Sequence, residues 1–186
     1  MERALVLVKP DGVERSLIGK VVDKFESAGL KVVAIKMLKA TEKLAGDHYI
    51  AEEAWLASVG KKTKASYLEK GVHVEETERE IGLRVRSLLM KEITRGPIVA
   101  IVLEGNAAND VARKLAGATE PRKADPSTIR GMYSVDSYER ADKTKRPVRN
   151  VVHVSEDSKA ADREIRVWFS ENEIYKYKRP DEETIY

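Results

Sequence analysis

Apolar residues along the chain fall into short runs that predict four strands. Residues 3–8, which are apolar from Ala4 onward, and the wholly apolar residues 98–103 show the pattern of strands buried on both faces. Residues 33–37 alternate between more and less apolar positions, as a half-buried strand does. Residues 150–154, Asn-Val-Val-His-Val, predict a fourth strand that contains a histidine.

Between these runs lie segments whose apolar residues have helical spacing. Ile18, Val21, Val22 and Phe25 lie on one helical face, and the helix they predict ends at Gly29. Thr41 is expected to cap a short helix after the second strand. Further helices are expected within 50–92 and over 107–116, and a last helix, capped by Ser158, carries Ile165, Trp168 and Phe169.

The order of elements predicts an α+β protein with a ferredoxin-like βαββαβ fold. We expect a four-stranded antiparallel sheet with helices on one face and an inserted helical segment between the second and third strands. The predicted single domain spans 1–170, with a helical insert at 53–92 and an extended loop at 132–149. Residues 171–186 form a polar tail that is expected to wrap over the surface.

Composition narrows the functional classes. The chain has 186 residues, enough for one domain with a sizeable core. Its net charge of +3, from 34 basic and 31 acidic residues, gives no reason to expect a nucleic-acid or membrane partner. It has no cysteine, so it has no disulfides and no thiolate metal site. No signal-peptide core or apolar run long enough to cross a bilayer is visible, and we expect a cytoplasmic protein.

His153 is the most informative residue. Imidazole is costly to bury unless both ring nitrogens are satisfied, so a core histidine bonded to backbone is the ordinary interpretation. Cations and hydroxyl groups elsewhere in the chain, able to hold phosphate, favour a reactive histidine instead. We expect His48 and His73 to be structural or exposed, because neither has a partner at metal-ligand spacing, and we expect no zinc site.

Several short motifs occur in a fixed order. They are Lys9-Pro-Asp-Gly12, His48-Tyr49, Gly96-Pro97, Arg113, Ala118-Thr119, Thr128-Ile-Arg-Gly131 and Asn150-Val-Val-His-Val-Ser155. In this order they resemble the nucleoside diphosphate kinase family over about 1–52 and 93–169, with two longer segments between them. The resemblance implies transfer of the terminal phosphate of a nucleoside triphosphate, such as ATP, to nucleoside diphosphates by a ping-pong mechanism.

The resemblance also implies roles for individual residues. His153 would be the catalytic nucleophile, and Ser155 and Glu164 would orient its ring. The residues expected to bind nucleotide are Lys9, Arg113 and Arg130 at the phosphates, Thr119 at the β-phosphate, Tyr49 near the γ-phosphate and Asn150 at the sugar. Mg²⁺ would arrive with the nucleotide phosphates and need no cage of its own. The family assembles as hexamers or tetramers built from dimers, so we expect a homo-oligomer.

The chain departs from the family pattern at several positions. Val154 replaces a small residue after the histidine, Glu156 replaces Asp, and Met132 replaces Asp after Arg130-Gly131. The Pro-Phe-Phe segment that supplies the base-stacking aromatic is missing, and Trp55 or Tyr67 are the candidates to replace it.

Two other functional interpretations remain open. The departures fit a non-catalytic nucleotide-binding or regulatory relative, although the set of reacting groups is intact. An RNA-binding module would share the sheet topology but needs exposed aromatics on the central strands, which this chain lacks. Residues 139–149 carry five basic and two acidic side chains, as either a basic flap over the nucleotide or a solvated loop would.

Overall fold

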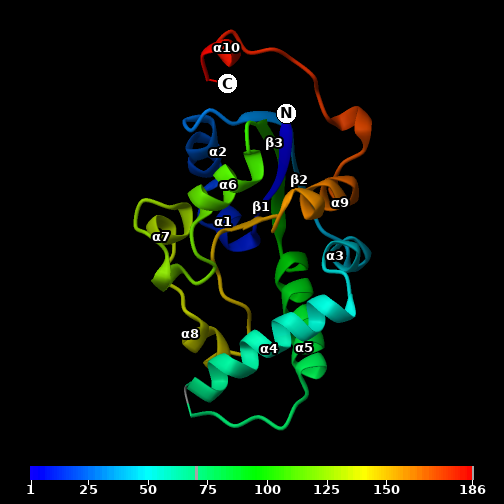
Figure 1. The fold of residues 1–186 in the computed structure, drawn as a ribbon, viewed down its shortest axis with the longest axis vertical. Helices are drawn as coiled ribbons and strands as arrows, with labels where there is room; N and C mark the ends of the chain where they lie inside the picture. Colours follow the sequence, from blue (N-terminus) through cyan, green and yellow to red (C-terminus); the bar gives the residue numbers. More distant parts are fainter. Residues whose placement is uncertain (70, 186) are drawn as a thin grey trace.

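The predicted ferredoxin-like fold is confirmed. A computed structural model describes residues 1–69 and 71–185; residues 70 and 186, which fall in the predicted insert and tail, lie outside it. The strands β1 (Glu2–Val8), β2 (Lys31–Lys39), β3 (Pro97–Gly105) and β4 (Val152–Val154) form one antiparallel sheet in the order β2-β3-β1-β4 (Figure 1).

Helices cover both faces of this sheet. Alternation along β1 sends Val6 and Val8 to one face and Leu5 and Leu7 to the other. The helices are α1 (Pro10–Glu14), α2 (Ile18–Glu26), α3 (Glu42–His48), α4 (Glu53–Glu69), α5 (Glu78–Thr94), α6 (Ala108–Ala116), α7 (Ile129–Tyr133), α8 (Tyr138–Lys143), α9 (Ser158–Trp168) and α10 (Glu182–Ile185), with short 3₁₀ helices η1 (Pro121–Lys123) and η2 (Glu171–Glu173).

The two crossover helices, α2 and α6, pack on the Val6 face, as the predicted fold requires. The Leu5 face, for which the sequence predicted no helices, is covered by α3, α9 and the end of α5 (Figure 1). Apolar residues on α9, such as Ile165 and Trp168, complete the core on this side. The second layer brings α9 against the strand that carries the predicted nucleophile.

Of the two predicted helix caps, one is confirmed and the other lies one residue away from its predicted position. The Thr41 side chain accepts the N–H of Leu44 at 3.1 Å and caps α3, as predicted. The predicted Ser158 cap of the last helix is wrong, because Asp157 accepts the N–H of Ala160 at 2.7 Å and Ser158 is already helical. Both residue types are good caps, so local sequence could not separate them.

The last strand is shorter than the predicted 150–154 because Val151 has a left-handed backbone with φ of 69°. This conformation is strained for a β-branched residue. Two contacts with the turn after β1 hold it: the Val151 N–H donates to Asp11 Oδ2 at 2.9 Å, and its carbonyl accepts the Lys9 N–H at 2.8 Å. A Cβ on Gly12 would lie 3.0 Å from the Val151 carbonyl oxygen, so the turn needs glycine there.

The predicted insert folds as a helical hairpin of α4 and α5. A Cβ on Gly60 would lie 1.7 Å from the Glu78 carbonyl oxygen, and one on Gly82 would lie 2.3 Å from that of Leu56. The two helix backbones therefore touch at both glycines. The predicted extended loop at 132–149 is partly helical, since it contains the end of α7 and all of α8.

The tail follows the outer edge of β2. The Tyr175 N–H donates to the Val33 carbonyl at 2.9 Å, and the buried Lys31 binds Glu182 at 2.7 Å and Glu104 at 3.0 Å. Within residues 1–69 and 71–185, none of the helices combines the length and apolar character that a membrane span requires.

The glycine contact between α4 and α5 gives a stability prediction. Gly60→Ala and Gly82→Ala should each lower the free energy of unfolding by about 1–3 kcal/mol, because the added methyl group overpacks a backbone contact. Urea unfolding measures this. Gly19→Ala in α2, where a Cβ meets nothing within 4 Å, is the matched control and should not destabilise the protein. Equal effects at all three glycines would contradict the packing argument.

Candidate active site

Glu164 holds the ring of His153. The register pairs His153 with Leu7, so its side chain lies on the sheet face that α9 covers. The Nε2 atom of His153 lies 2.9 Å from Glu164 Oε2, and the Ser155 hydroxyl donates to the same oxygen at 2.7 Å. The other carboxylate oxygen accepts a hydrogen bond from Arg163 at 3.1 Å. The structure therefore brings His153 together with Ser155 and Glu164, the two residues predicted to orient its ring.

The charge of Glu164 decides which nitrogen of His153 can react. Burial alone raises the pKa of this carboxyl, but the hydrogen bond and charge of His153 outweigh burial and lower it to about 2. An ionised carboxylate only accepts hydrogen bonds, so Nε2 carries the proton and donates it. The lone pair then resides on Nδ1, and the described residues offer this atom no hydrogen-bond partner. His153 is also partly open to solvent, with 23% of its side chain exposed.

His48 packs against His153, although the two residues lie far apart in the sequence. It ends α3, is 2% exposed, and its ring meets that of His153 edge-on at 4.6 Å between centroids. Trp168 Nε1 donates to His48 Nδ1 at 3.2 Å. Burial, with the charge of His153, lowers the pKa of His48 to about 3, so the ring is neutral. The sequence identified His48 as structural or exposed; it is buried, and its contact with His153 was missed.

His48, His153 and Glu164 are a combination of residue types that can hold a metal ion, and their ligand atoms lie within 4.8 Å of one another. The hydrogen bonds of these three residues occupy most of the atoms that could bind a metal ion. The Nδ1 lone pair of His48 accepts the Trp168 N–H, so its proton is on Nε2. Glu164 already binds His153, Ser155 and Arg163. This arrangement orients the ring of His153.

Three cations approach the segment that carries His153. Lys9 Nζ donates to the Val148 carbonyl at 3.2 Å, and burial lowers the pKa of Lys9 while Asp11 and Glu92 oppose the shift. Arg113, on α6, is exposed and reaches the Ser155 carbonyl at 3.5 Å. Arg130 donates to the Gly117 carbonyl at 2.6 Å and the Val152 carbonyl at 3.0 Å. Burial lowers the pKa of Arg130 to about 10, so it stays charged at neutral pH.

The Thr-Ile-Arg-Gly motif shows why each residue type is needed to place Arg130. The Thr128 hydroxyl caps α7 by accepting the Gly131 N–H at 3.2 Å. Ile129 is fully buried in the core and anchors the turn. A Cβ on Gly131 would lie 2.1 Å from the Asp125 carbonyl oxygen, so no side chain fits there.

The remaining predicted nucleotide-binding residues lie around the same segment. The Asn150 amide donates to the Thr119 carbonyl at 2.7 Å, so these two residues are neighbours. The Tyr49 ring centroid lies 6.5 Å from that of His153, and burial, with the charges of Glu164 and Glu92, raises the pKa of Tyr49. All nine predicted site residues therefore lie in residues 150–155 or contact residues 148–155.

The residues that depart from the family pattern lie on the opposite sheet face or at the surface. Val154 is buried on the sheet face opposite His153, Glu156 is exposed, and Met132 is 55% exposed. In the basic segment 139–149, Arg146 binds Asp136 and Lys143 binds Glu139 at 2.8 Å, so both cations have local acidic partners.

Comparisons with known proteins agree with this geometry. A family model described as nucleoside diphosphate kinase matches residues 2–56 and 75–174. The chain belongs to the nucleoside diphosphate kinase family. The family and enzyme class predicted from the motifs are confirmed. The unmatched residues 57–74 lie within the predicted insert 53–92.

Individual relatives match over nearly the whole chain. A nucleoside diphosphate kinase of Pyrobaculum aerophilum is 43% identical over 179 residues, which cover 94% of this chain and 98% of the relative. A crystal structure of an NDP kinase from the same organism superimposes with a TM-score of 0.91, at 41% identity, covering 94% of this chain and 99% of the other.

A solved nucleoside diphosphate kinase of Borrelia burgdorferi, a transition-state mimic with bound vanadate and ADP, gives a TM-score of 0.78. It is 40% identical, and the match covers 97% of this chain and 94% of that one. A halophilic kinase from Halobacterium salinarum in complex with CDP gives 0.72 at 33% identity, covering 100% and 98% of the two chains.

The buried, neutral His48 gives a prediction about pH. The unfolded chain binds a proton at this histidine below about pH 6.5, but the folded chain does so only near pH 3, so stability must fall as pH drops between these values. His48→Gln, whose amide can still accept the Trp168 N–H, should lose less stability between pH 6.5 and 4.5. We expect its slope to be smaller by up to about 1.4 kcal/mol per pH unit.

Urea unfolding at several pH values measures these slopes. His73→Gln is the control, because His73 is exposed and should leave the slope unchanged. Identical slopes for wild type and His48→Gln would show that His48 does not titrate as the structure indicates.

Proposed function

We propose that this chain transfers the terminal phosphate of nucleoside triphosphates to nucleoside diphosphates by a ping-pong mechanism through a phosphohistidine at His153. The observation that carries the proposal is the hydrogen bond between His153 Nε2 and the ionised Glu164, which leaves the Nδ1 lone pair available. Family membership supports the same activity.

The chemistry follows from this geometry. The Nδ1 lone pair attacks the terminal phosphorus, the bond from phosphorus to the bridging oxygen breaks, and the nucleoside diphosphate leaves with that oxygen. The phosphorylated ring keeps its Nε2 proton and is positively charged, and the carboxylate of Glu164 stabilises it. In the second half-reaction a terminal oxygen of another diphosphate attacks the phosphorus, and the Nδ1–phosphorus bond breaks.

The surrounding residues would bind the phosphate chain and the sugar. Lys9, Arg113 and Arg130 lie around the His153 segment, where their charges would stabilise the transferring group. The proposed roles of the neutral residues are those expected from the sequence: Thr119 at the β-phosphate, Tyr49 near the γ-phosphate and Asn150 at the sugar hydroxyl.

The residues around His153 fit a Mg²⁺ ion that is carried by the nucleotide. Mg²⁺ prefers several oxygen ligands, but Glu164 serves His153, and Asp11, whose Oδ2 accepts the Val151 N–H, has only its buried Oδ1 without a partner. The other polar groups of the predicted site are cations, amides and hydroxyls. Phosphate oxygens and water would therefore hold the ion, which would neutralise phosphate charge when bound.

Two further expectations belong to this proposal. Relatives in this family have been solved with ADP and with CDP, which supports nucleotide substrates for this chain. A homo-oligomer, as hexamer or tetramer, and a cytoplasmic location remain predictions from the sequence and its resemblance. The grouping of Glu164, Lys9 and Arg130 around the His153 segment supports the catalytic function over the non-catalytic alternative.

A phosphorylated enzyme tests the function directly. Incubation with ATP and Mg²⁺ should add one phosphoryl group, seen by intact-mass analysis at neutral pH and lost in acid. Added GDP or CDP should remove it and yield the triphosphate. His153→Ala should gain no mass, whereas the control His73→Ala should behave as wild type. A non-catalytic relative would show no added mass, and phosphorylation of His153→Ala would show that the nucleophile is wrong.

The two arginines should separate activity from stability. Arg113→Ala should lower turnover by about two to three orders of magnitude, as loss of one preorganised donor does, with an unchanged melting temperature. Arg130→Ala should lose similar activity and also about 1–3 kcal/mol of stability, because two backbone carbonyls lose their donor. Thermal unfolding and steady-state kinetics measure both, and a stability loss confined to Arg113→Ala would contradict the assignment.

A further inference from the structure

Glu92 is a buried acidic side chain that the proposed mechanism does not use. It lies near the end of α5 and is 7% exposed. Burying a carboxylate is costly unless cations pair with it. Two arginines do so at one oxygen, since Arg95 Nε lies 2.8 Å and Arg149 Nε 3.4 Å from Glu92 Oε1.

The ion pairs of Glu92 join three segments of the chain. Arg95 also binds Glu14 of α1, with 3.0 Å between Nη2 and Oε2, so one end of the network reaches the turn after β1. The other end is Arg149, in the segment that leads into β4. Glu92 therefore connects α1, the end of α5 and the chain just before the strand of the nucleophile.

The segment 148–150 contacts or contains two of the proposed nucleotide-binding residues. The Val148 carbonyl accepts a hydrogen bond from Lys9 Nζ at 3.2 Å, and Asn150 is the residue proposed to bind the sugar. Arg149 lies between them in the sequence, and its side chain is the link from this segment to Glu92. A shift of Arg149 would move both neighbours, because each is one residue away along the chain.

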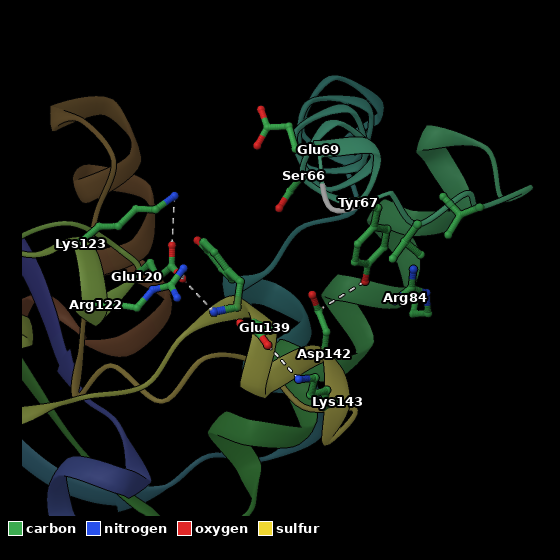
Figure 2. Close-up of a pocket in the computed structure, with 13 residues that line it drawn as sticks. Ser66, Tyr67, Glu69, Arg84, Glu120, Arg122, Lys123, Glu139, Asp142 and Lys143 are labelled. Carbon is green, nitrogen blue, oxygen red and sulfur yellow. Dashed lines mark hydrogen bonds and ion pairs between the residues drawn. The ribbon is translucent and has the colours of Figure 1, made fainter.

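Two anchors hold Arg149. Its backbone N–H donates to Asp136 Oδ2 at 2.8 Å, within the extended loop, whereas Glu92 anchors its side chain from outside that loop. The hairpin that supplies Glu92 is itself fixed against the loop at its tip, where Tyr67 of α4 donates to Asp142 of α8 at 3.3 Å. Figure 2 shows this contact beside a cavity of about 760 Å³ that both residues line. Glu92 therefore acts from an element that is held in place.

Glu92 also affects the charge of Lys9. Burial lowers the pKa of Lys9, and the charges of Arg130 and Arg95 lower it further. The carboxylates of Asp11 and Glu92 raise it, so they favour the charged amine that binds phosphate. On its own, a carboxylate near a phosphate-binding lysine would weaken phosphate binding by repulsion, so a compensating role is expected.

We propose that Glu92 is a positioning residue for nucleotide binding, which fixes Arg149 and thereby the carbonyl that binds Lys9 and the amide of Asn150. Its negative charge also supports the positive charge of Lys9. The inference rests on the proposed function and adds to it a residue that acts through Arg149.

Calorimetric titration with ADP tests the proposal. Glu92→Gln should weaken ADP binding by about tenfold, the loss expected when one charge-assisted hydrogen bond is removed. Arg149→Gln breaks the same contact from a side chain that is 46% exposed, so it leaves the fold intact and should give a similar loss. Because the two residues act through one contact, the double variant should lose no more than either single variant.

Glu53→Gln is the matched control. It removes a carboxylate that binds Arg79 at 3.0 Å elsewhere on the same hairpin, and it should bind ADP as wild type does. The pH dependence adds a measurement that a merely structural role would not change. In Glu92→Gln, the alkaline limb of kcat/KM should move to lower pH, because Lys9 loses its proton more readily without the carboxylate. In Glu53→Gln it should stay in place.

Unchanged or tighter ADP binding in Glu92→Gln would overturn the proposal, as would an equal loss in Glu53→Gln or losses that add in the double variant. An alkaline limb that does not move in Glu92→Gln would overturn the effect assigned to Lys9. The phosphorylated enzyme separates these outcomes from a failure of the proposed function. Glu92→Gln should still form it at saturating ATP, whereas a wild-type protein that forms none would refute the function and leave the ADP comparison valid.

Discussion

The site depends on the hydrogen bond between the carboxylate of Glu164 and the ring of His153. It is buried, yet the hydrogen bond and charge of His153 lower its pKa to about 2, so it stays ionised. One of its oxygens accepts from His153 and Ser155, and the other from Arg163. The carboxylate thereby fixes the ring, its tautomer and the free Nδ1 lone pair. It can do so only because α9 packs on the same sheet face that His153 occupies.

A second constraint lies on the other side of the nucleophile. Val151 adopts a left-handed backbone, which costs on the order of 1–3 kcal/mol, and the surrounding contacts must offset this. The hydrogen bonds that the Lys9 backbone and the Asp11 side chain make with Val151 stabilise this conformation, and Gly12 allows the two segments to approach closely. The Lys-Pro-Asp-Gly turn therefore supports the strand that presents His153, and it also carries Lys9, the cation proposed to bind phosphate.

Much of this could be predicted from the sequence, because strands, caps and motifs are local. The strand at 98–103 and the helix cap at Thr41 each depend on residues a few positions away in the sequence, so local patterns predict them. Contacts between distant segments were not predictable. His48 meets His153 only after α3 folds over the sheet, and the second helical layer depends on where α9 returns.

The central claim is that Glu164 leaves Nδ1 of His153 as the nucleophile. Nuclear magnetic resonance of the phosphorylated enzyme, prepared with isotopically labelled histidine, identifies the nitrogen that is coupled to phosphorus. We expect phosphorus on Nδ1 and a proton on Nε2 that is protected from exchange by Glu164. Phosphorus on Nε2, or on a residue other than His153, would contradict the mechanism.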